Sequence, residues 1–252
     1  MSFPTWSDLN DRGIIEPYGA RKGFESGSSL SVMVSTDPDF NYIKSNATKG
    51  TTKPLFMGTL FTQGEKGASF AGPYIGAPYG AMIAETLIAK GAHTIVVFGW
   101  CGAISKDLSV GDILVVDGAL ADEGTSRNYM AQTEPFPRVL PDPGLQQRLC
   151  NEFAAGDIPV KTGTLWTTDA IYRETPKKID FFRDKGAVAV EMECSALFAV
   201  ATYRRARIAA VMVVSDALST DTWEPGFRSK RFKTARKQVA DTLLNLCRKD
   251  DL

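Results

Sequence analysis

Short apolar runs of β-forming residues alternate with segments of helical spacing along most of this chain, and this alternation constrains its fold more than any other feature. Strands that alternate with helices predict a mainly parallel sheet with helices on its faces. The expected strands cover residues 30–34, 55–62, 68–72, 94–98, 113–116, 161–167, 188–191 and 208–214. The expected helices cover residues 77–90, 144–155, 193–204 and 231–248.

The 252 residues are expected to form one domain, because this length can bury one substantial core and no repeat or linker divides the chain. Residues 1–29 are polar, rich in Gly and Ser and weakly periodic. We expect them to form an arm without a fold of its own, followed by a single α/β domain over residues 30–252. The stretch 133–144 contains several prolines and is expected to be a surface loop, with part of a lid as one interpretation.

Charge and hydropathy limit the classes of partner. The 29 basic and 29 acidic side chains cancel, so no overall field attracts nucleic acid or an acidic membrane surface. No apolar run approaches the roughly 20 residues of a membrane helix, and the first 22 residues lack the pattern of a signal peptide. We therefore expect a cytoplasmic protein that binds a small molecule, not nucleic acid or a membrane.

Cysteine and histidine are too sparse for several kinds of site. The four cysteines, Cys101, Cys150, Cys194 and Cys247, are widely spaced without a CxxC pair, which argues against zinc and against a disulfide framework. The only histidine, His93, lies where a helix is expected to end and a strand to begin. Neither Ser nor Cys occurs in a recognisable nucleophile turn. We expect no metal, and chemistry carried by carboxylates.

The first segment that could carry chemistry follows the strand expected at 94–98. It contains Gly99, Trp100, Cys101 and Gly102. Closely spaced glycines let a ligand approach backbone N–H groups without a Cβ in the way. A tight turn between a strand and a helix explains the same residues, and the glycine pair by itself favours that turn.

The second segment places Glu191, Met192 and Glu193 where the strand at 188–191 meets the helix at 193–204. Residues two apart along a strand share a face, and a buried acid there needs a partner. A sugar diol offers two hydroxyl donors. The alternative is an acid at a helix N-terminus, which the helix dipole favours. That alternative accounts for one acid more readily than for two.

The third segment is the apolar run 209–214, which fits a strand buried on both faces and ends in Ser215 and Asp216. Asp216 is either a turn or cap residue, or a general acid whose pKa is raised by burial. Ligands of α/β sheets gather where strands end. We therefore expect the acids of the second and third segments to converge on one sugar-sized cavity.

In this order, the three segments resemble the nucleoside phosphorylase-I family, which includes purine nucleoside phosphorylases, uridine phosphorylases and methylthioadenosine nucleosidases. The resemblance extends from about residue 31 to residue 248, and its most specific elements are 99–103 with 110–112, 190–193 and 214–216. It implies a twisted, mixed and mostly parallel central sheet, partly closed into a barrel and flanked by helices. It also implies no cofactor, inorganic phosphate as co-substrate, and a homo-oligomer: a dimer, a trimer of dimers or a hexamer.

Carried over residue by residue, the resemblance implies two catalytic residues. Glu193 would hydrogen-bond the ribose 2′ and 3′ hydroxyls, and Asp216 would protonate or hydrogen-bond the base at N7. Met192 would pack beneath the sugar, while Ile171 and Tyr172 occupy the positions of the base-stacking aromatics. The other substrate-binding residues implied are Gly99, Trp100, Cys101, Gly102, Ser215 and, in a weaker role, Glu191.

The sequence departs from the family at the phosphate site. The usual glycine and arginine of the first loop align with Thr36 and Phe40, the strand arginine with Val97, and the Ser or Thr of the glycine-rich segment with Trp100. Phe, Val and Trp lack the charge-assisted donors that make anion sites strong.

Two interpretations of this departure stay open. In the first, Lys53 or another basic residue rebuilds the phosphate site together with Thr36. In the second, water is the acceptor and an acid such as Asp37 or Asp39 orients it.

The leading hypothesis is a pentosyltransferase of the nucleoside phosphorylase type, which would act in nucleoside metabolism and salvage. It would cleave the N-glycosidic bond of a purine or uridine nucleoside by ribosyl transfer to phosphate. The alternatives are a nucleoside hydrolase on the same scaffold, a non-catalytic nucleoside-binding protein, and an unrelated α/β binding protein.

Overall fold

The computed structural model describes residues 9–11, 13–17, 29–64, 67–131, 134–218 and 222–248. Most of the expected arm, residues 1–29, lies outside this part of the chain. The strands are β1 (Leu30–Val34), β2 (Gly50–Leu55), β3 (Gly58–Gln63), β4 (Ser69–Gly72), β5 (Thr94–Ala103), β6 (Ile113–Asp122), β7 (Arg138–Val139), β8 (Lys161–Thr168), β9 (Ala187–Glu191), β10 (Arg207–Ala217) and β11 (Glu224–Pro225). The α-helices are α1 (Asp37–Asn46), α2 (Ala77–Ala89), α3 (Pro143–Ala155), α4 (Pro176–Asp184), α5 (Cys194–Arg204) and α6 (Lys230–Arg248), and η1 (Ser126–Asn128) and η2 (Ile171–Arg173) are short 3₁₀ helices.

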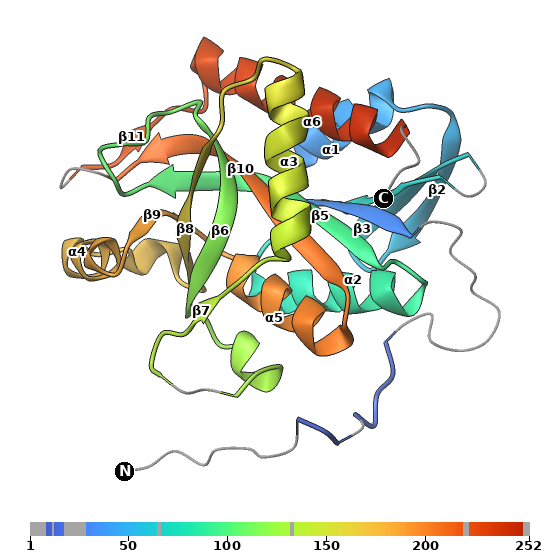
Figure 1. The fold of residues 1–252 in the computed structure, drawn as a ribbon, viewed down its shortest axis with the longest axis horizontal. Helices are drawn as coiled ribbons and strands as arrows, with labels where there is room; N and C mark the ends of the chain where they lie inside the picture. The colour runs from blue at the N-terminus through green and yellow to red at the C-terminus, as the bar shows by residue number, and fades with distance from the viewer. Residues whose placement is uncertain are drawn as a thin grey trace.

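Five strands close into a barrel, which confirms the expected architecture (Figure 1). β5 pairs with β10, β10 with β6, β6 with β8, β8 with β9, and β9 again with β5. The β10–β6 and β9–β5 pairings are antiparallel, and the other three are parallel. From β5 the sheet continues through β1, β4, β3 and β2. The sheet is therefore mixed, with its parallel strands at the centre.

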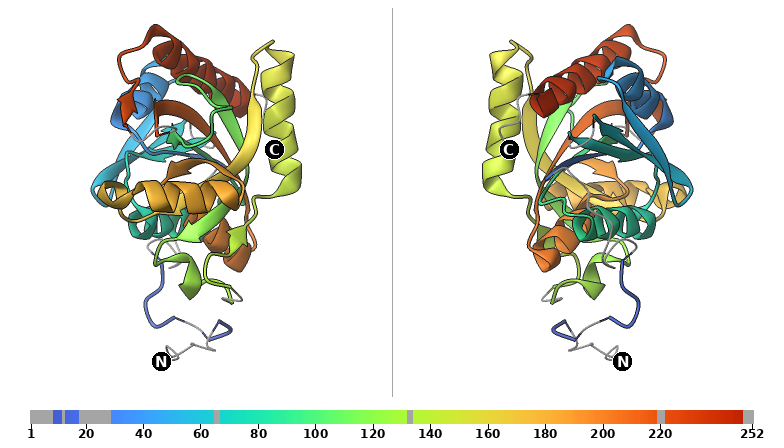
Figure 2. Two further views of the ribbon diagram at one scale, coloured as in Figure 1. Left: turned by 90° about the vertical axis from the view of Figure 1, so that its left-hand side faces the viewer. Right: turned by 90° about the vertical axis from the view of Figure 1, so that its right-hand side faces the viewer.

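Helices cover the sheet on opposite sides (Figures 1 and 2). α1 and α6 pack together on one side, and α2 and α5 pack together on the other. Central strands are buried against both layers: Val97 belongs to the core on the α2 and α5 side, while the next residue, Phe98, belongs to the core under α1 and α6. This explains why β5 and β10 appear as continuous apolar runs without polar alternation.

The strand expected over residues 55–62 is wrong, because the chain reverses within it. Leu55 ends β2 and pairs with Gly58 at the start of β3. Phe56 adopts a positive φ of 53° in the turn between them. Neither turn residue, Phe56 nor Met57, belongs to the residue types that usually mark a hairpin, so the pattern concealed the reversal.

Helices α1 and α4 were not expected from the sequence. Both carry a proline at the first or second helical position, Pro38 and Pro176, where its missing N–H costs nothing. Thr175 precedes α4 and its hydroxyl accepts a hydrogen bond from the Lys178 N–H. Asp37, for which a turn was one interpretation, is the first residue of α1.

The tight turn favoured for Gly99 and Gly102 is also wrong, since both lie within β5, which continues to Ala103. A Cβ on Gly99 would lie 2.8 Å from the Ser35 Oγ, and a Cβ on Gly102 would lie 3.2 Å from an Asp216 carboxylate oxygen. The glycines therefore let two neighbouring polar side chains approach the strand closely.

The expected loop at 133–144 contains β7, which pairs with β6. None of the helices in the described part of the chain has the length and apolarity that a membrane crossing requires.

Candidate active site

The three sequence segments meet at one cavity of about 490 Å³, where β5, β9 and β10 end. The predicted site residues that line it are Thr36, Trp100, Cys101, Gly102, Ile171, Tyr172, Glu191, Met192, Glu193, Ser215 and Asp216. Two predicted site residues do not line the cavity. Gly99 precedes the lining residue Trp100 in β5, and Lys53 is exposed on β2.

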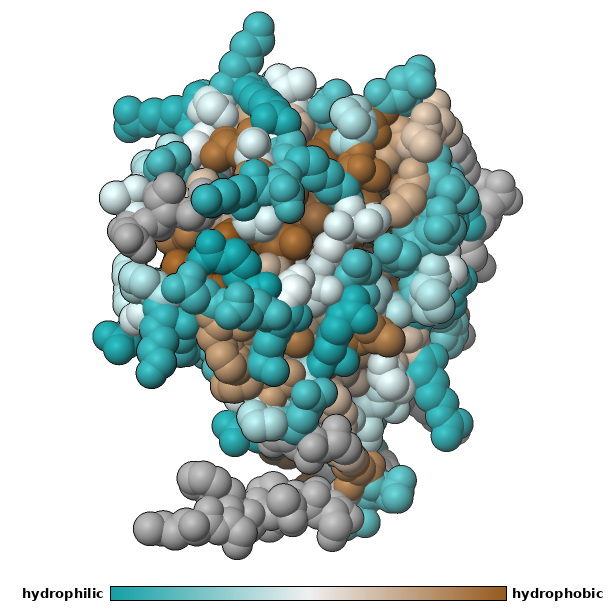
Figure 3. Space-filling view, turned by 60° about the vertical axis from the view of Figure 1, so that its left-hand side comes forward, coloured by the Kyte–Doolittle hydropathy of each residue, from teal (hydrophilic) through white to brown (hydrophobic). Residues whose placement is uncertain are grey.

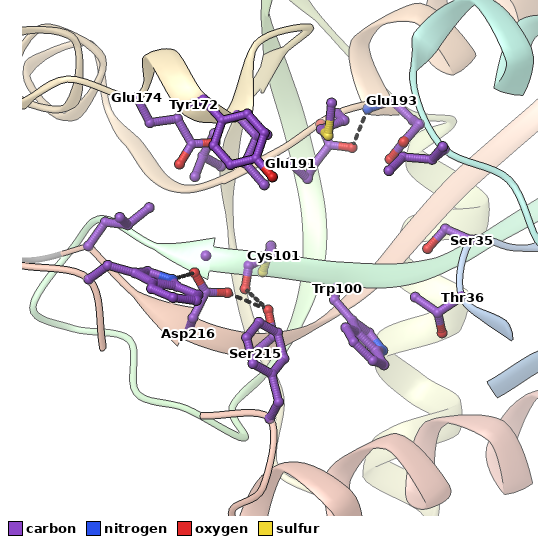
Figure 4. A pocket seen from close by; sticks show the side chains of 18 of the residues that line it. Ser35, Thr36, Trp100, Cys101, Tyr172, Glu174, Glu191, Glu193, Ser215 and Asp216 are labelled. Atoms are coloured by element: carbon purple, nitrogen blue, oxygen red, sulfur yellow. Dashed lines mark hydrogen bonds between the residues drawn. The ribbon is translucent and has the colours of Figure 1, made fainter. Parts of the chain in front are cut away.

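The lining forms two facing walls (Figure 4). Glu174, Tyr172, Glu191 and Glu193 lie along one wall, while Asp216, Ser215, Trp100 and Thr36 lie along the other. Glu174 and Asp216 face each other at one end, and Glu193 lies near Ser35 and Thr36 at the opposite end. Viewed toward the side that carries α4 and β11, the molecule shows apolar surface recessed among hydrophilic side chains (Figure 3).

Glu193 is fixed at the start of α5. It is the N-cap residue of that helix, and one of its carboxylate oxygens accepts a hydrogen bond of 2.5 Å from the Gly76 N–H. Glu193 is only 8% exposed. Burial, and then the charge of Glu191, raise the pKa of Glu193 to about 8. The Gly76 N–H contacts one of the two carboxylate oxygens, and Glu193 lines the cavity, where a ligand can contact its carboxyl group.

Glu191 holds this arrangement in place. Its carboxylate accepts hydrogen bonds from the backbone N–H groups of Glu193, at 2.7 Å, and Cys194, at 2.8 Å. The Thr167 hydroxyl also donates to it. Burial raises the pKa of Glu191. Glu191 is therefore the acid whose side chain caps the N-terminus of α5, which was the alternative interpretation of this segment. Glu193 lines the cavity.

Asp216 lies at the irregular end of β10, where the register shifts between Val214 and Asp216. The Trp223 indole N–H donates to one of its oxygens at 2.8 Å. The Ser215 hydroxyl lies 2.5 Å from the other oxygen and 3.2 Å from the Cys101 carbonyl. Because that hydroxyl has one hydrogen for two acceptors, it can donate to ionised Asp216 or accept from protonated Asp216.

Glu174 is a fourth carboxyl group in the lining, and no sequence pattern singled it out. It follows η2 and is half-buried. Burial, and then the charge of Asp216, raise the pKa of Glu174 to about 7, while Lys178 opposes the shift. Its place on an irregular segment between β8 and α4, away from any strand end, left no local signal.

Large apolar and aromatic side chains also line the cavity; Ile171, Tyr172, Trp223 and Phe227 are exposed, and Tyr74 is buried. Ile171 and Tyr172 lie on η2 and are 52% and 97% exposed, so they form part of the rim. Tyr74, Trp223 and Phe227 also line the cavity and were not predicted.

A family model described as the phosphorylase superfamily matches residues 30–248. The chain belongs to the phosphorylase superfamily. It is 33% identical over 144 residues to a guanosine phosphorylase of Halorubrum lacusprofundi, a match that covers 57% of this chain and 58% of that protein. It is 29% identical over 192 residues to a DeoD-type purine nucleoside phosphorylase of Tolumonas auensis, covering 75% of this chain and 80% of the relative.

Solved structures of the phosphorylase superfamily share the fold. Purine nucleoside phosphorylase of Toxoplasma gondii superposes with a TM-score of 0.79 at 18% identity, covering 94% of this chain and 99% of that chain. Uridine phosphorylase of Vibrio fischeri gives a TM-score of 0.77 at 19% identity, covering 95% and 100% of the two chains.

In this member of the phosphorylase superfamily, the region expected to hold phosphate contains an ion pair between a buried carboxylate and a mostly buried guanidinium. Asp39, which is 2% exposed, accepts hydrogen bonds from the Thr36 hydroxyl at 2.8 Å and from the Trp100 indole at 2.7 Å. Arg236 of α6 forms a 2.7 Å ion pair with Asp39, and its guanidinium lies 4.7 Å from the centre of the Trp100 ring. Arg236 was missed because 197 residues separate it from Asp39.

Neither residue proposed to orient a water lines the cavity. Asp37 is exposed and accepts a hydrogen bond from Asn41, and Asp39 forms an ion pair with Arg236. Among the described lining residues there are four acids and neither Lys nor Arg.

Proposed function

We propose that this protein cleaves the N-glycosidic bond of a nucleoside bound in the cavity, with the sugar at the Glu193 end and the base at the Asp216 end. One observation carries the proposal: these two carboxyl groups come from separate strand ends and line the same cavity of about 490 Å³. That volume lies within the range of small-molecule sites.

Glu193 anchors the sugar in this proposal. Its carboxyl group accepts hydrogen bonds from the ribose hydroxyls, while the Gly76 N–H and the support from Glu191 hold its position. Met192 packs against the furanose. Glycosidic cleavage builds positive charge on the sugar, and acids fixed nearby stabilise that charge more in the transition state than in the ground state.

Asp216 assists departure of the base. Negative charge develops on the base as the bond breaks, so a group that donates or shares a proton at that end lowers the barrier. Ser215 supports this role because its hydroxyl can serve either protonation state of Asp216. The relatives named as guanosine and purine nucleoside phosphorylases favour a purine base.

Phosphate is the acceptor that the named relatives favour, since each is called a phosphorylase. The anion would need cations from outside this lining, and Lys53 of a second copy in a homo-oligomer is the candidate that the sequence offers.

Hydrolysis is a second candidate, and the Asp39–Arg236 pair favours it. A buried carboxylate beside Thr36 and Trp100 repels an anion and occupies the guanidinium that would otherwise attract one. Water carries no charge and avoids that penalty.

A nucleoside panel, assayed with and without inorganic phosphate, tests both candidates. Phosphorolysis predicts base release that needs phosphate and yields ribose 1-phosphate. Hydrolysis predicts equal release in both conditions with free ribose as product. Binding of nucleosides without release of any base under either condition would refute the proposed cleavage.

A further inference from the structure

We propose that Glu174 is a general acid of this site, which delivers a proton to the leaving base while Asp216 faces it from the opposite wall. The inference rests on the proposed function and adds a catalytic residue to it. Three observations support it: the position of Glu174, its lack of a bonding partner and the charges that surround it.

The position of Glu174 is at the base end of the cavity. It lines the same space as Asp216 and lies on the facing wall, so a base between the walls contacts both carboxyl groups (Figure 4). Glu193 lies at the other end of the same wall, where the proposed function places the sugar.

The bonding of the two carboxyl groups differs. Asp216 is held by Trp223 and Ser215, which contact one oxygen each. For Glu174, no hydrogen bond or ion pair to the carboxyl group is found within the described residues. A half-buried carboxyl group without protein partners remains free to bond a ligand.

Burial, and then the surrounding charges, keep a proton on Glu174 near neutral pH. Asp216 of β10 faces it with a negative charge, and Lys178 of α4 is the cation that opposes this effect. The Lys178 ammonium is itself paired with Asp122 at 2.9 Å, which weakens its influence. With its pKa raised to about 7, Glu174 holds its proton in part of the molecules at neutral pH and can release it there.

Transfer of the Glu174 proton accompanies cleavage of the bond between sugar and base. The bond between the sugar C1′ and the base nitrogen breaks, and its electron pair stays on the base. The Glu174 O–H proton moves to a ring nitrogen of the base, which leaves Glu174 as a carboxylate. The acceptor, phosphate or water, forms the new bond to C1′. If the acceptor is water, the proton that it loses restores the acid form of Glu174. If the acceptor is phosphate, Glu174 takes a proton back from solvent after the products leave.

The test compares Glu174→Gln with Asp180→Asn, a control in which an exposed acid on the neighbouring helix α4 is neutralised. Each variant is assayed with a purine nucleoside and with p-nitrophenyl β-D-ribofuranoside, whose phenolate departs without protonation. We expect Glu174→Gln to lower kcat for the nucleoside by about 10²-fold or more, and kcat for the p-nitrophenyl riboside by less than about 3-fold, because only the first needs an acid. Asp180→Asn should match wild type on both.

The pH profile separates an acid from a group that only positions the base. Wild-type kcat for the nucleoside should fall as pH rises above about 7, where Glu174 loses its proton, and Glu174→Gln should lose this limb. Equal losses on both substrates, or an unchanged limb in the variant, would overturn the role of Glu174. If wild type cleaves neither substrate, the proposed function itself fails.

Discussion

Replacing Glu193 with Gln tests how the sugar is held. The substitution preserves size and leaves one carbonyl oxygen that can still accept from the Gly76 N–H. The group turned toward the ligand becomes an amide NH₂ in place of a carboxylate oxygen. Above about pH 8, where Glu193 is ionised, the ribose hydroxyls then lose charge-assisted hydrogen bonds and keep neutral ones.

The size of the effect follows from that difference. A hydrogen bond to a charged group contributes about 1.5–3 kcal/mol and a neutral one about 0.5–1.5 kcal/mol. Each hydroxyl therefore loses about 1–1.5 kcal/mol, and two lose about 2–3 kcal/mol. Because 1.4 kcal/mol corresponds to a factor of ten, Glu193→Gln should lower kcat/KM for a ribonucleoside by roughly 30- to 150-fold.

The assay pairs this variant with a change in the substrate. Steady-state kcat/KM is measured above about pH 8, where Glu193 is ionised, for wild type and Glu193→Gln with a ribonucleoside and with its 2′-deoxy counterpart. The deoxy substrate already lacks one of the two hydroxyls, so the variant should lose only about 5- to 15-fold on it, half of the free energy. An identical loss on both substrates would refute contact between Glu193 and the 2′ hydroxyl.

Three further predictions concern Asp216, Glu193 and Asp39. Asp216→Asn should lower kcat for a nucleoside by about 10²-fold. It should also move the fall in rate near pH 7 to lower pH, because the Asp216 charge that helps to raise the pKa of Glu174 is gone. A pH–rate profile checks both effects. Stability should fall as pH rises from about 4.5 through about 8, because folded Glu193, with its raised pKa, binds a proton that the unfolded chain has released; urea titrations should show a smaller decline for Glu193→Gln, and parallel curves would contradict this. Asp39→Asn should reduce the free energy of unfolding by up to about 3–5 kcal/mol, because it leaves the mostly buried Arg236 without its partner; a loss below about 1 kcal/mol would show that the ion pair adds little to stability.

The central strands could be predicted because their residues serve two cores at once. Val97 and Phe98 pack against opposite helix layers, which requires an apolar side chain at every position, and β10 follows the same rule. The hairpin at Phe56 could not be found this way, because its turn residues look like strand residues. Helices α1 and α4 did carry a usable signal, the proline in each first turn.

The site was predictable where acids interrupt apolar strand ends. Glu193 and Asp216 stand out in that way, and the structure brings both to one cavity. Glu174 lies on an irregular segment where an acid is unremarkable, and only the fold places it opposite Asp216. Arg236 could not be predicted for the same reason, because its ion pair with Asp39 depends on how α6 packs on α1.

The most direct test of the account is a crystal structure with a slowly cleaved purine nucleoside analogue bound. The account predicts the furanose against Met192, with its hydroxyls within hydrogen-bond distance of Glu193. The base should lie between Glu174 and Asp216. A base found at the Glu193 end, or an analogue bound away from this cavity, would contradict it.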